Sequence, residues 1–268
     1  MTNPSENPFA VVTGASSGIG FELARQLAGH GFDLLVVAED EGIEEAAADL
    51  RRDGRNQITA VRADLAQYDG VEQAWAAIEA TGRSIDVLAL NAGRGIGGEF
   101  VGGTDLADEM NVIDVNVTST VHLAKRALPG MVARGRGRVL ITSSIASMMP
   151  GTYQAVYNAS KSFTQSFAEA LHAELKDTGV TVTSLMPGPT DTNFFHRAEM
   201  DDTRVGASDK KDDPALVAEQ AIRALLDGRE KVQAGSVKTK AQAAASKVMP
   251  DRAKAEMHRR MAEPGSAS

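Results

Sequence analysis

Short apolar runs alternate along this chain with longer segments in which apolar residues recur every three or four positions. A short apolar run is typical of a buried strand, and the three-to-four spacing is typical of an amphipathic helix. The pattern predicts strands at 9–12, 33–38, 57–61, 85–90, 138–142, 180–185 and 231–234, and helices near 18–29, 41–53, 69–81, 104–127, 152–177 and 214–227.

This alternation predicts an α/β fold, because strands separated by helices form a parallel sheet that helices cover on both faces. Right-handed crossovers make such a sheet doubly wound, a Rossmann-type arrangement of three α/β/α layers. Neither an internal repeat nor a linker divides the chain. We therefore predict one domain over 1–236, followed by a basic helical extension over 237–268 that packs on this domain or on a partner subunit.

A glycine-containing turn, Thr13-Gly-Ala-Ser-Ser-Gly-Ile-Gly20, lies between the first predicted strand and the first predicted helix. Glycines let the backbone approach a pyrophosphate closely, and the free N–H groups of a helix N-terminus bind anions. The spacing differs from G-x-G-x-x-G, and a tight helix-entry turn without a ligand is the alternative. The strand before the turn and the helix after it favour a phosphate site.

A tyrosine and a lysine, Tyr157 and Lys161, lie four residues apart in the predicted helix 152–177. Side chains at this spacing share one helix face, so both can point into one cavity. A free tyrosine has a pKa of about 10, and a neighbouring ammonium favours the phenolate. We therefore expect Lys161 to lower the pKa of Tyr157, so that the phenol can exchange a proton with an alcohol or ketone.

Together with further motifs, these residues resemble the short-chain dehydrogenase/reductase family in its single-domain branch, over roughly residues 8–235. The sequence departs from the family at Leu90, where an asparagine is usual, and in the run Ala38-Glu39-Asp40. The further motifs are Asp64-Leu65, Asn91-Ala92-Gly93, Asn116 in Asp-Val-Asn-Val, Ser143-Ser144, and Pro187-Gly188 followed by Thr192.

The resemblance implies four catalytic residues: Asn116, Ser144, Tyr157 and Lys161. Tyr157 would be the general acid or base, and Lys161 would also hold the nicotinamide ribose. Ser144, thirteen residues before Tyr157, would hydrogen-bond the substrate oxygen, with Ser143 as its rival. Asn116 would keep a water chain to Lys161 in place.

The resemblance also implies a nicotinamide cofactor. Ala38 stands where the family's NAD-selecting aspartate lies, and Glu39 stands where many NADP-using members carry arginine. Because Glu39 would repel a phosphate, we expect NAD(H) to be preferred; NADP(H) stays open, since Arg62 or Arg25 could turn toward a phosphate. The expected cofactor contacts are Gly14, Ser16, Ser17, Gly18, Ile19, Gly20, Glu39, Asp64, Leu65, Asn91, Ala92, Gly93, Tyr157, Lys161, Pro187, Gly188, Thr190 and Thr192.

The expected substrate pocket is largely apolar. Its candidate residues could also belong to the core, and the polar segment 201–213 after them suits a mobile lid or a solvated loop. The candidates are Ser144, Met149, Gln154, Phe194 and Phe195.

Composition excludes several other function classes. The net charge of −8 argues against nucleic-acid binding, although residues 231–268 carry a net charge of +5 and the rest −13. With no cysteine, and with five histidines that show no ligand spacing, we expect no metal. No apolar run reaches the roughly 20 residues of a membrane span, and the first eight residues lack a signal-peptide pattern, so we expect a cytoplasmic protein.

We therefore predict an NAD(P)-dependent oxidoreductase that interconverts a carbonyl and a secondary alcohol on a small or medium, partly apolar substrate. The alternative is a nucleotide-binding protein that senses the cofactor without turnover. The family usually pairs its long helices between subunits, here 104–127 and 152–177, which implies a homodimer or homotetramer.

Overall fold

The computed structural model describes residues 7–52, 56–237, 239–241 and 249–267. Seven parallel strands form one sheet in the order β3-β2-β1-β4-β5-β6-β7. The order reverses between β1 and β4, which is where a doubly wound sheet opens a crevice beyond its carboxyl edge. The strands are β1 Phe9–Thr13, β2 Asp33–Ala38, β3 Ile58–Arg62, β4 Val87–Leu90, β5 Gly137–Thr142, β6 Val180–Pro187 and β7 Lys231–Ala234.

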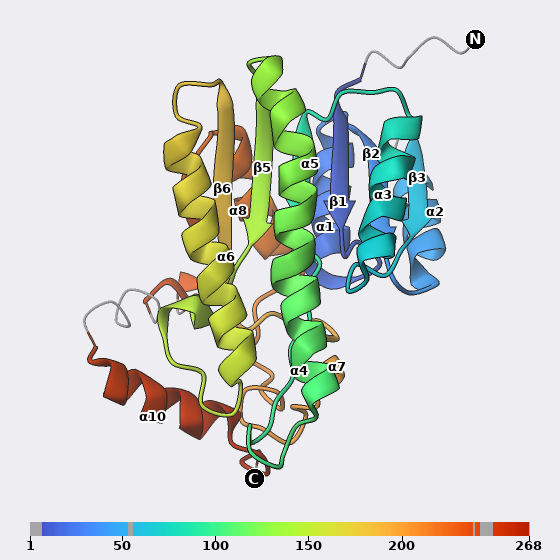
Figure 1. The fold of residues 1–268 in the computed structure, drawn as a ribbon. Helices are drawn as coiled ribbons and strands as arrows, with labels where there is room; N and C mark the ends of the chain where they lie inside the picture. Colours follow the sequence, from blue (N-terminus) through green and yellow to red (C-terminus); the bar gives the residue numbers. More distant parts are fainter. Residues whose placement is uncertain (1–6, 53–55, 238, 242–248, 268) are drawn as a thin grey trace.

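The helices form two layers around this sheet (Figure 1). One apolar core contains buried residues of α1, α2 and α8, and the other contains buried residues of α3, α5 and α6. The Rossmann-type α/β fold is thus confirmed. The helices are α1 Gly18–Gly29, α2 Gly42–Arg52, α3 Tyr68–Ala80, α4 Leu106–Ile113, α5 Ser119–Ala133, α6 Ala155–Glu174, α7 Phe194–Arg197, α8 Pro214–Leu226 and α10 Asp251–Ala262, with a π-helical turn η1 Asp114–Thr118 and a 3₁₀ turn η2 Ile145–Met148.

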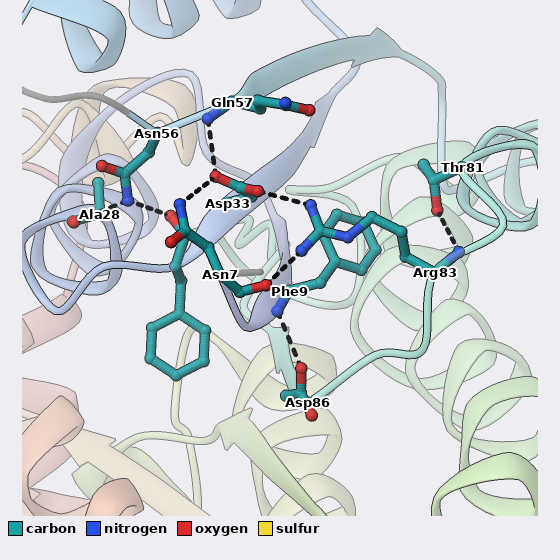
Figure 2. Close-up of polar contacts among 10 residues, drawn as sticks. Asn7, Phe9, Ala28, Asp33, Asn56, Gln57, Thr81, Arg83 and Asp86 are labelled. Atoms are coloured by element: carbon teal, nitrogen blue, oxygen red, sulfur yellow. Dashed lines mark hydrogen bonds and ion pairs between the residues drawn. The ribbon is translucent and has the colours of Figure 1, made fainter. Parts of the chain in front are cut away.

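A polar network ties the strands together at their amino ends, opposite the crevice (Figure 2). The buried carboxylate of Asp33 accepts hydrogen bonds from Arg83 Nη1 at 2.7 Å and from the backbone N–H of Gln57 at 2.8 Å. Asp86 accepts a further bond from the backbone N–H of Phe9 at 2.9 Å. Because every one of these carboxylates has partners, the network fixes the edge of the sheet without leaving a buried charge unpaired.

The predicted helix 104–127 is divided in the structure. α4 runs into the π-helical turn η1, and α5 continues from it. A π-helical turn holds one extra residue and often marks a functional position within a helix. Here it contains Asn116, whose side chain is buried.

The last helix, α10, lies at the lower edge of the molecule in Figure 1. It begins after Pro250, and the end of the helix together with the residues that follow it contacts the segment 201–206. The polar segment 201–213 is held there: the Val205 N–H donates to Met261 O at 3.1 Å, and the Ala267 N–H to Asp202 O at 2.9 Å. Residues 238, 242–248 and 268 of the predicted extension lie outside the described residues.

Candidate active site

The glycine turn leads into α1 with two residues in the left-handed region, Gly14 at φ +64° and Gly18 at φ +57°. Glycine adopts this backbone without strain, whereas other residues rarely do. Ser17 caps α1 but makes no side-chain cap bond, and the first turn carries no acidic side chain. Within the described part of the chain, no side chain accepts a hydrogen bond from the N–H groups of this turn, so the turn suits an anionic ligand.

A cleft runs from the glycine turn to the first turn of α6, along the carboxyl ends of the strands. It brings together all but one of the expected cofactor contacts, and all five expected substrate contacts. The expected cofactor contacts that line it are Gly14, Ser16, Ser17, Gly18, Ile19, Gly20, Glu39, Leu65, Asn91, Ala92, Gly93, Tyr157, Lys161, Pro187, Gly188, Thr190 and Thr192.

Asp64 is the expected contact that does not line the cleft. Its side chain is exposed and accepts a hydrogen bond from the backbone N–H of Ala66 at 2.9 Å, which starts the turn before α3. The neighbouring residues Ala63 and Leu65 line the cleft instead.

The loop after β4 is clamped between two strands. Thr13 Oγ1 accepts the backbone N–H groups of Asn91 and Ala92, both at 3.0 Å. The Asn91 amide donates to Thr13 O at 3.2 Å, and its oxygen accepts from Thr142 Oγ1 at 3.0 Å. These bonds use the polar atoms of Asn91, so its role in the structure is to hold the loop that carries Ala92 and Gly93.

Tyr157 lies in the cleft on the first turn of α6, against the ring of Phe194 with a centroid distance of 5.2 Å. Burial raises the pKa of Tyr157 to about 12, and a hydrogen bond with the Ser144 side chain lowers it in part. Ser144 Oγ also accepts the Ala146 N–H at 3.1 Å, which orients it. Ser143, the rival serine, donates to Lys161 O at 2.8 Å and thereby ties β5 to α6.

Lys161 is buried one turn behind Tyr157. Its Nζ donates to Thr142 O at 3.0 Å and lies 5.8 Å from the centre of the Tyr157 ring. Burial lowers the pKa of Lys161 to about 8. The expected direction for Tyr157 is therefore reversed in this state: desolvation of the phenol outweighs an ammonium that faces Thr142 and is itself destabilised by burial.

Asn116 does not line the cleft but lies directly behind it. Its Oδ1 accepts the Arg94 N–H at 2.8 Å, and its Nδ2 donates to Arg94 O at 2.9 Å and to Ser160 Oγ at 2.8 Å. Its oxygen and the Lys161 ammonium both lie beside Gly93, where an added Cβ would be 3.3 Å and 3.1 Å from them. Asn116 thus joins η1, α6 and the loop after β4 at the position of Lys161.

The other end of the cleft is apolar. Phe194 and Phe195 meet edge to face at a centroid distance of 5.4 Å, and the lining also includes the buried side chain of Met149. Gln154 is buried too, and no partner for its Nε2 is found among the residues that the structure describes. An unpaired buried amide costs about 1–3 kcal/mol, a cost that a ligand oxygen would remove.

Several residues that line the cleft belong to none of the sequence motifs and were not predicted to lie there. Arg94 lines the cleft and forms a salt bridge with Asp108 at 2.8 Å. The tail residues His258, Met261 and Ala262 line it as well, although they lie about a hundred positions after Tyr157.

Among the described residues, no group of His, Asp or Glu side chains comes together as a metal site would require. In the same part of the chain, each helix is too short or too polar to cross a bilayer.

The sequence profile of the short chain dehydrogenase family matches residues 8–203. The chain belongs to the short-chain dehydrogenase family. It is 33% identical over 228 residues to "Dehydrogenase/reductase SDR family member 7B" of Rattus norvegicus, covering 82% of this chain and 70% of that protein. It is 32% identical over 198 residues to "NADP-dependent 3-hydroxy acid dehydrogenase YdfG" of Salmonella typhi, covering 73% and 79%.

The structure of a short-chain dehydrogenase from Sphingobium yanoikuyae in complex with NADPH is also similar to this short-chain dehydrogenase. It superposes with a TM-score of 0.76 at 28% identity, over 84% of this chain and 87% of the other. Family membership therefore agrees with the fold and confirms the resemblance that the sequence motifs indicate.

Proposed function

We propose that this short-chain dehydrogenase interconverts a carbonyl and a secondary alcohol on a small or medium, partly apolar molecule, with a nicotinamide cofactor. The observation that carries the proposal is the continuity of one cleft from the glycine turn to Tyr157, with Ser144 beside the phenol and Lys161 behind it. A turn suited to the cofactor phosphates and a phenol that can donate a proton share this cleft. This arrangement suits a reaction that combines hydride transfer from the cofactor with proton transfer from the protein.

Tyr157 is the general acid in the direction of reduction. Its raised pKa keeps the phenol protonated at neutral pH, which is the form that can give a proton to the carbonyl oxygen. Ser144 donates a hydrogen bond to the same oxygen as charge develops there. The phenolate then takes a proton back from solvent. In oxidation the proton moves in the opposite direction.

Lys161 and Asn116 support this proton transfer. A Lys161 ammonium within 5.8 Å of the phenol ring favours the phenolate that forms when Tyr157 loses its proton. Asn116, bonded to Ser160, holds the backbone N–H of Arg94, the residue after Gly93, and Gly93 lies beside the Lys161 ammonium. Lys161 therefore acts on the phenol of Tyr157, and Asn116 acts by holding the residues around Lys161.

The cofactor would lie with its pyrophosphate on the N–H groups of the glycine turn and its ribose hydroxyls near Tyr157 and Lys161. When bound, it supplies the hydride that becomes attached to the carbonyl carbon. Pro187, Gly188, Thr190 and Thr192 would cover it from the β6 side. An added Cβ at Gly18 would lie 2.9 Å from Thr192 Cγ2, so this cover lies directly on the glycine turn.

We propose that NAD(H) is preferred over NADP(H). Glu39 lines the cleft with an exposed carboxylate, and the carboxylate of Asp40 accepts a bond from Ser16 Oγ at 2.8 Å. Both anions oppose a phosphate on the adenosine ribose. The cation of Arg62 would favour such a phosphate and so oppose this preference. Its Nε donates to Glu39 O at 3.0 Å, and its Nη1 lies 2.9 Å from Glu41 Oε1.

Titration of the purified protein with NADH and with NADPH, followed by nicotinamide fluorescence, tests both proposals. We expect both to bind and NADH to bind roughly five- to tenfold more tightly, because repulsion between two exposed charges in water costs about 1 kcal/mol. Glu39→Gln should narrow the preference. Tighter binding of NADPH would contradict the NAD(H) preference and point to Arg62. If neither cofactor binds, the oxidoreductase proposal fails.

We also propose a homodimer or homotetramer that pairs α4, α5 and α6 with their copies. These helices expose apolar side chains: Leu106 is 76% exposed, Met110 46% and Phe163 43%. Such side chains gain free energy when a second copy removes them from water. Light scattering at micromolar concentration should give a multiple of the 28.2 kDa chain, and Met110→Asp should shift the protein toward smaller species. A monomeric wild type would contradict this assembly.

A further inference from the structure

The tail helix α10 supplies part of the wall of the cleft. His258, Met261 and Ala262 line it, and Ala262 packs in an apolar cluster with Phe195. The helix is attached to the loop before α6, where Thr152 Oγ1 donates to Ala255 O at 3.1 Å. A segment outside the family match at 8–203 thus contributes side chains to the substrate end of the cleft.

His258 is the polar side chain that this helix presents to the cleft. It is 5% exposed, and its Nδ1 lies 2.9 Å from the backbone oxygen of Thr152. A carbonyl oxygen only accepts, so Nδ1 carries the hydrogen of this bond. Burial lowers the pKa of His258, and the ring is therefore neutral at pH 7, with Nε2 as a lone-pair acceptor. None of the described residues gives Nε2 a hydrogen bond.

We propose that His258 is a specificity residue, whose Nε2 accepts a hydrogen bond from a hydroxyl of the substrate that is remote from the reacting carbonyl. The substrate class is then an apolar ketone, or the matching alcohol, that carries a second hydroxyl. This inference rests on the proposed function of the cleft, because it names a further contact of the same substrate.

The surroundings explain why a hydroxyl is the matching group. The helix that carries His258 brings the apolar side chains of Met261 and Ala262 to the cleft, and Ala262 packs with Phe195. A buried acceptor in such a wall loses its water and gains nothing from an apolar ligand. An ether or ketone oxygen cannot donate to Nε2, whereas a hydroxyl can. The unpaired amide of Gln154, two residues after Thr152, adds a donor to the same cleft.

Three ketones that differ at one remote position test the proposal: benzylacetone, para-hydroxybenzylacetone and para-methoxybenzylacetone. The hydroxyl compound can donate to Nε2, the methoxy compound only accepts, and benzylacetone does neither. For the wild type we expect kcat/KM for the hydroxyl compound to exceed that for the methoxy compound by about tenfold, the worth of one hydrogen bond. The ratio of these two values is the readout.

Variants of His258 separate its two nitrogens. His258→Asn keeps an N–H at the position of Nδ1, and so the bond to Thr152 O, but it has no atom at Nε2; the ratio should fall to about one. His258→Gln places a terminal amide near Nε2 and should restore part of the ratio. His172 is the matched control: its Nδ1 lies 2.9 Å from Val182 O, and it lies outside the cleft lining. His172→Asn should keep the wild-type ratio.

The outcomes distinguish this inference from the proposed function. The wild type could reduce the ketones without preferring the hydroxyl compound, or His258→Asn could keep the preference. Either result would show that His258 does not bind the substrate hydroxyl, and the oxidoreductase proposal would stand. If the wild type reduces none of them, affinities of the three ketones for the protein, measured by saturation-transfer NMR, provide the same ratio. Equal or absent binding of all three would overturn the inference.

Discussion

Tyr157→Phe is expected to lower the rate of ketone reduction by roughly 10²–10⁴-fold, because the variant loses the acid that protonates the carbonyl oxygen. The ring remains, and with it the packing against Phe194 at 5.2 Å, so the fold and the affinity for the reduced cofactor should stay close to those of the wild type. Single-turnover kinetics with benzylacetone and a parallel fluorescence titration measure the two quantities separately.

Tyr153→Phe is the matched control for this variant. The Tyr153 hydroxyl lies 3.4 Å from Glu263 Oε1, and the side chain lies outside the cleft lining. Its loss should change the rate little. If Tyr157→Phe kept wild-type turnover, Tyr157 would not be the acid, and a cofactor-sensing protein without turnover would be excluded as well.

Lys161→Met is expected to reduce turnover by roughly 10²-fold or more and to alter how stability depends on pH. Burial lowers the pKa of Lys161 from 10.5 to about 8 in the folded protein. Between these values the unfolded chain binds a proton that the folded protein does not, so wild-type stability rises with pH. The difference corresponds to about 3 kcal/mol, and the variant lacks it.

Denaturant unfolding of the cofactor-free protein at pH 7 and at pH 10 measures this effect. The free energy of unfolding of Lys161→Met, relative to the wild type, should be higher at pH 7 than at pH 10. Lys231→Met provides the control: the hydrogen bond with Glu169 raises the pKa of Lys231, so this lysine is protonated in the folded and the unfolded chain alike over most of this range, and the relative stability of the variant should change little between pH 7 and pH 10. If the stability of Lys161→Met relative to the wild type does not change with pH, burial does not lower the pKa of Lys161 in the folded protein.

The sequence was sufficient to predict the sheet and to place most of the candidate site residues along one cleft at the carboxyl ends of its strands. All seven predicted strands exist. The five inner strands are almost wholly buried, and such strands of a parallel sheet are apolar runs that contrast with the helices between them, whereas the edge strands β3 and β7 are only partly buried. The glycine turn and the pair Tyr157 and Lys161 were found for a similar reason: their chemistry depends on residues close together in the sequence, so short spacings carry the signal.

Features that depend on tertiary contacts were not predictable. Asn116 in the π-helical turn bonds to Arg94 and Ser160, and the helical spacing of 104–127 reveals neither the turn nor these contacts. The pKa of Tyr157 depends on how completely the phenol is buried, which outweighs the nearby Lys161. The contribution of His258 to the cleft depends on where α10 packs, and its partner Thr152 lies 106 positions away.

The most direct test of the central claim is to follow the hydride itself. The wild type is mixed with benzylacetone and a reduced nicotinamide cofactor that carries deuterium at its transferable position, and the product alcohol is analysed by mass spectrometry. We expect one deuterium on the carbinol carbon, formed by the wild type and lost with Tyr157→Phe. Cofactor that binds in the cleft while neither benzylacetone nor its hydroxyl analogue gains deuterium would contradict the proposed oxidoreductase.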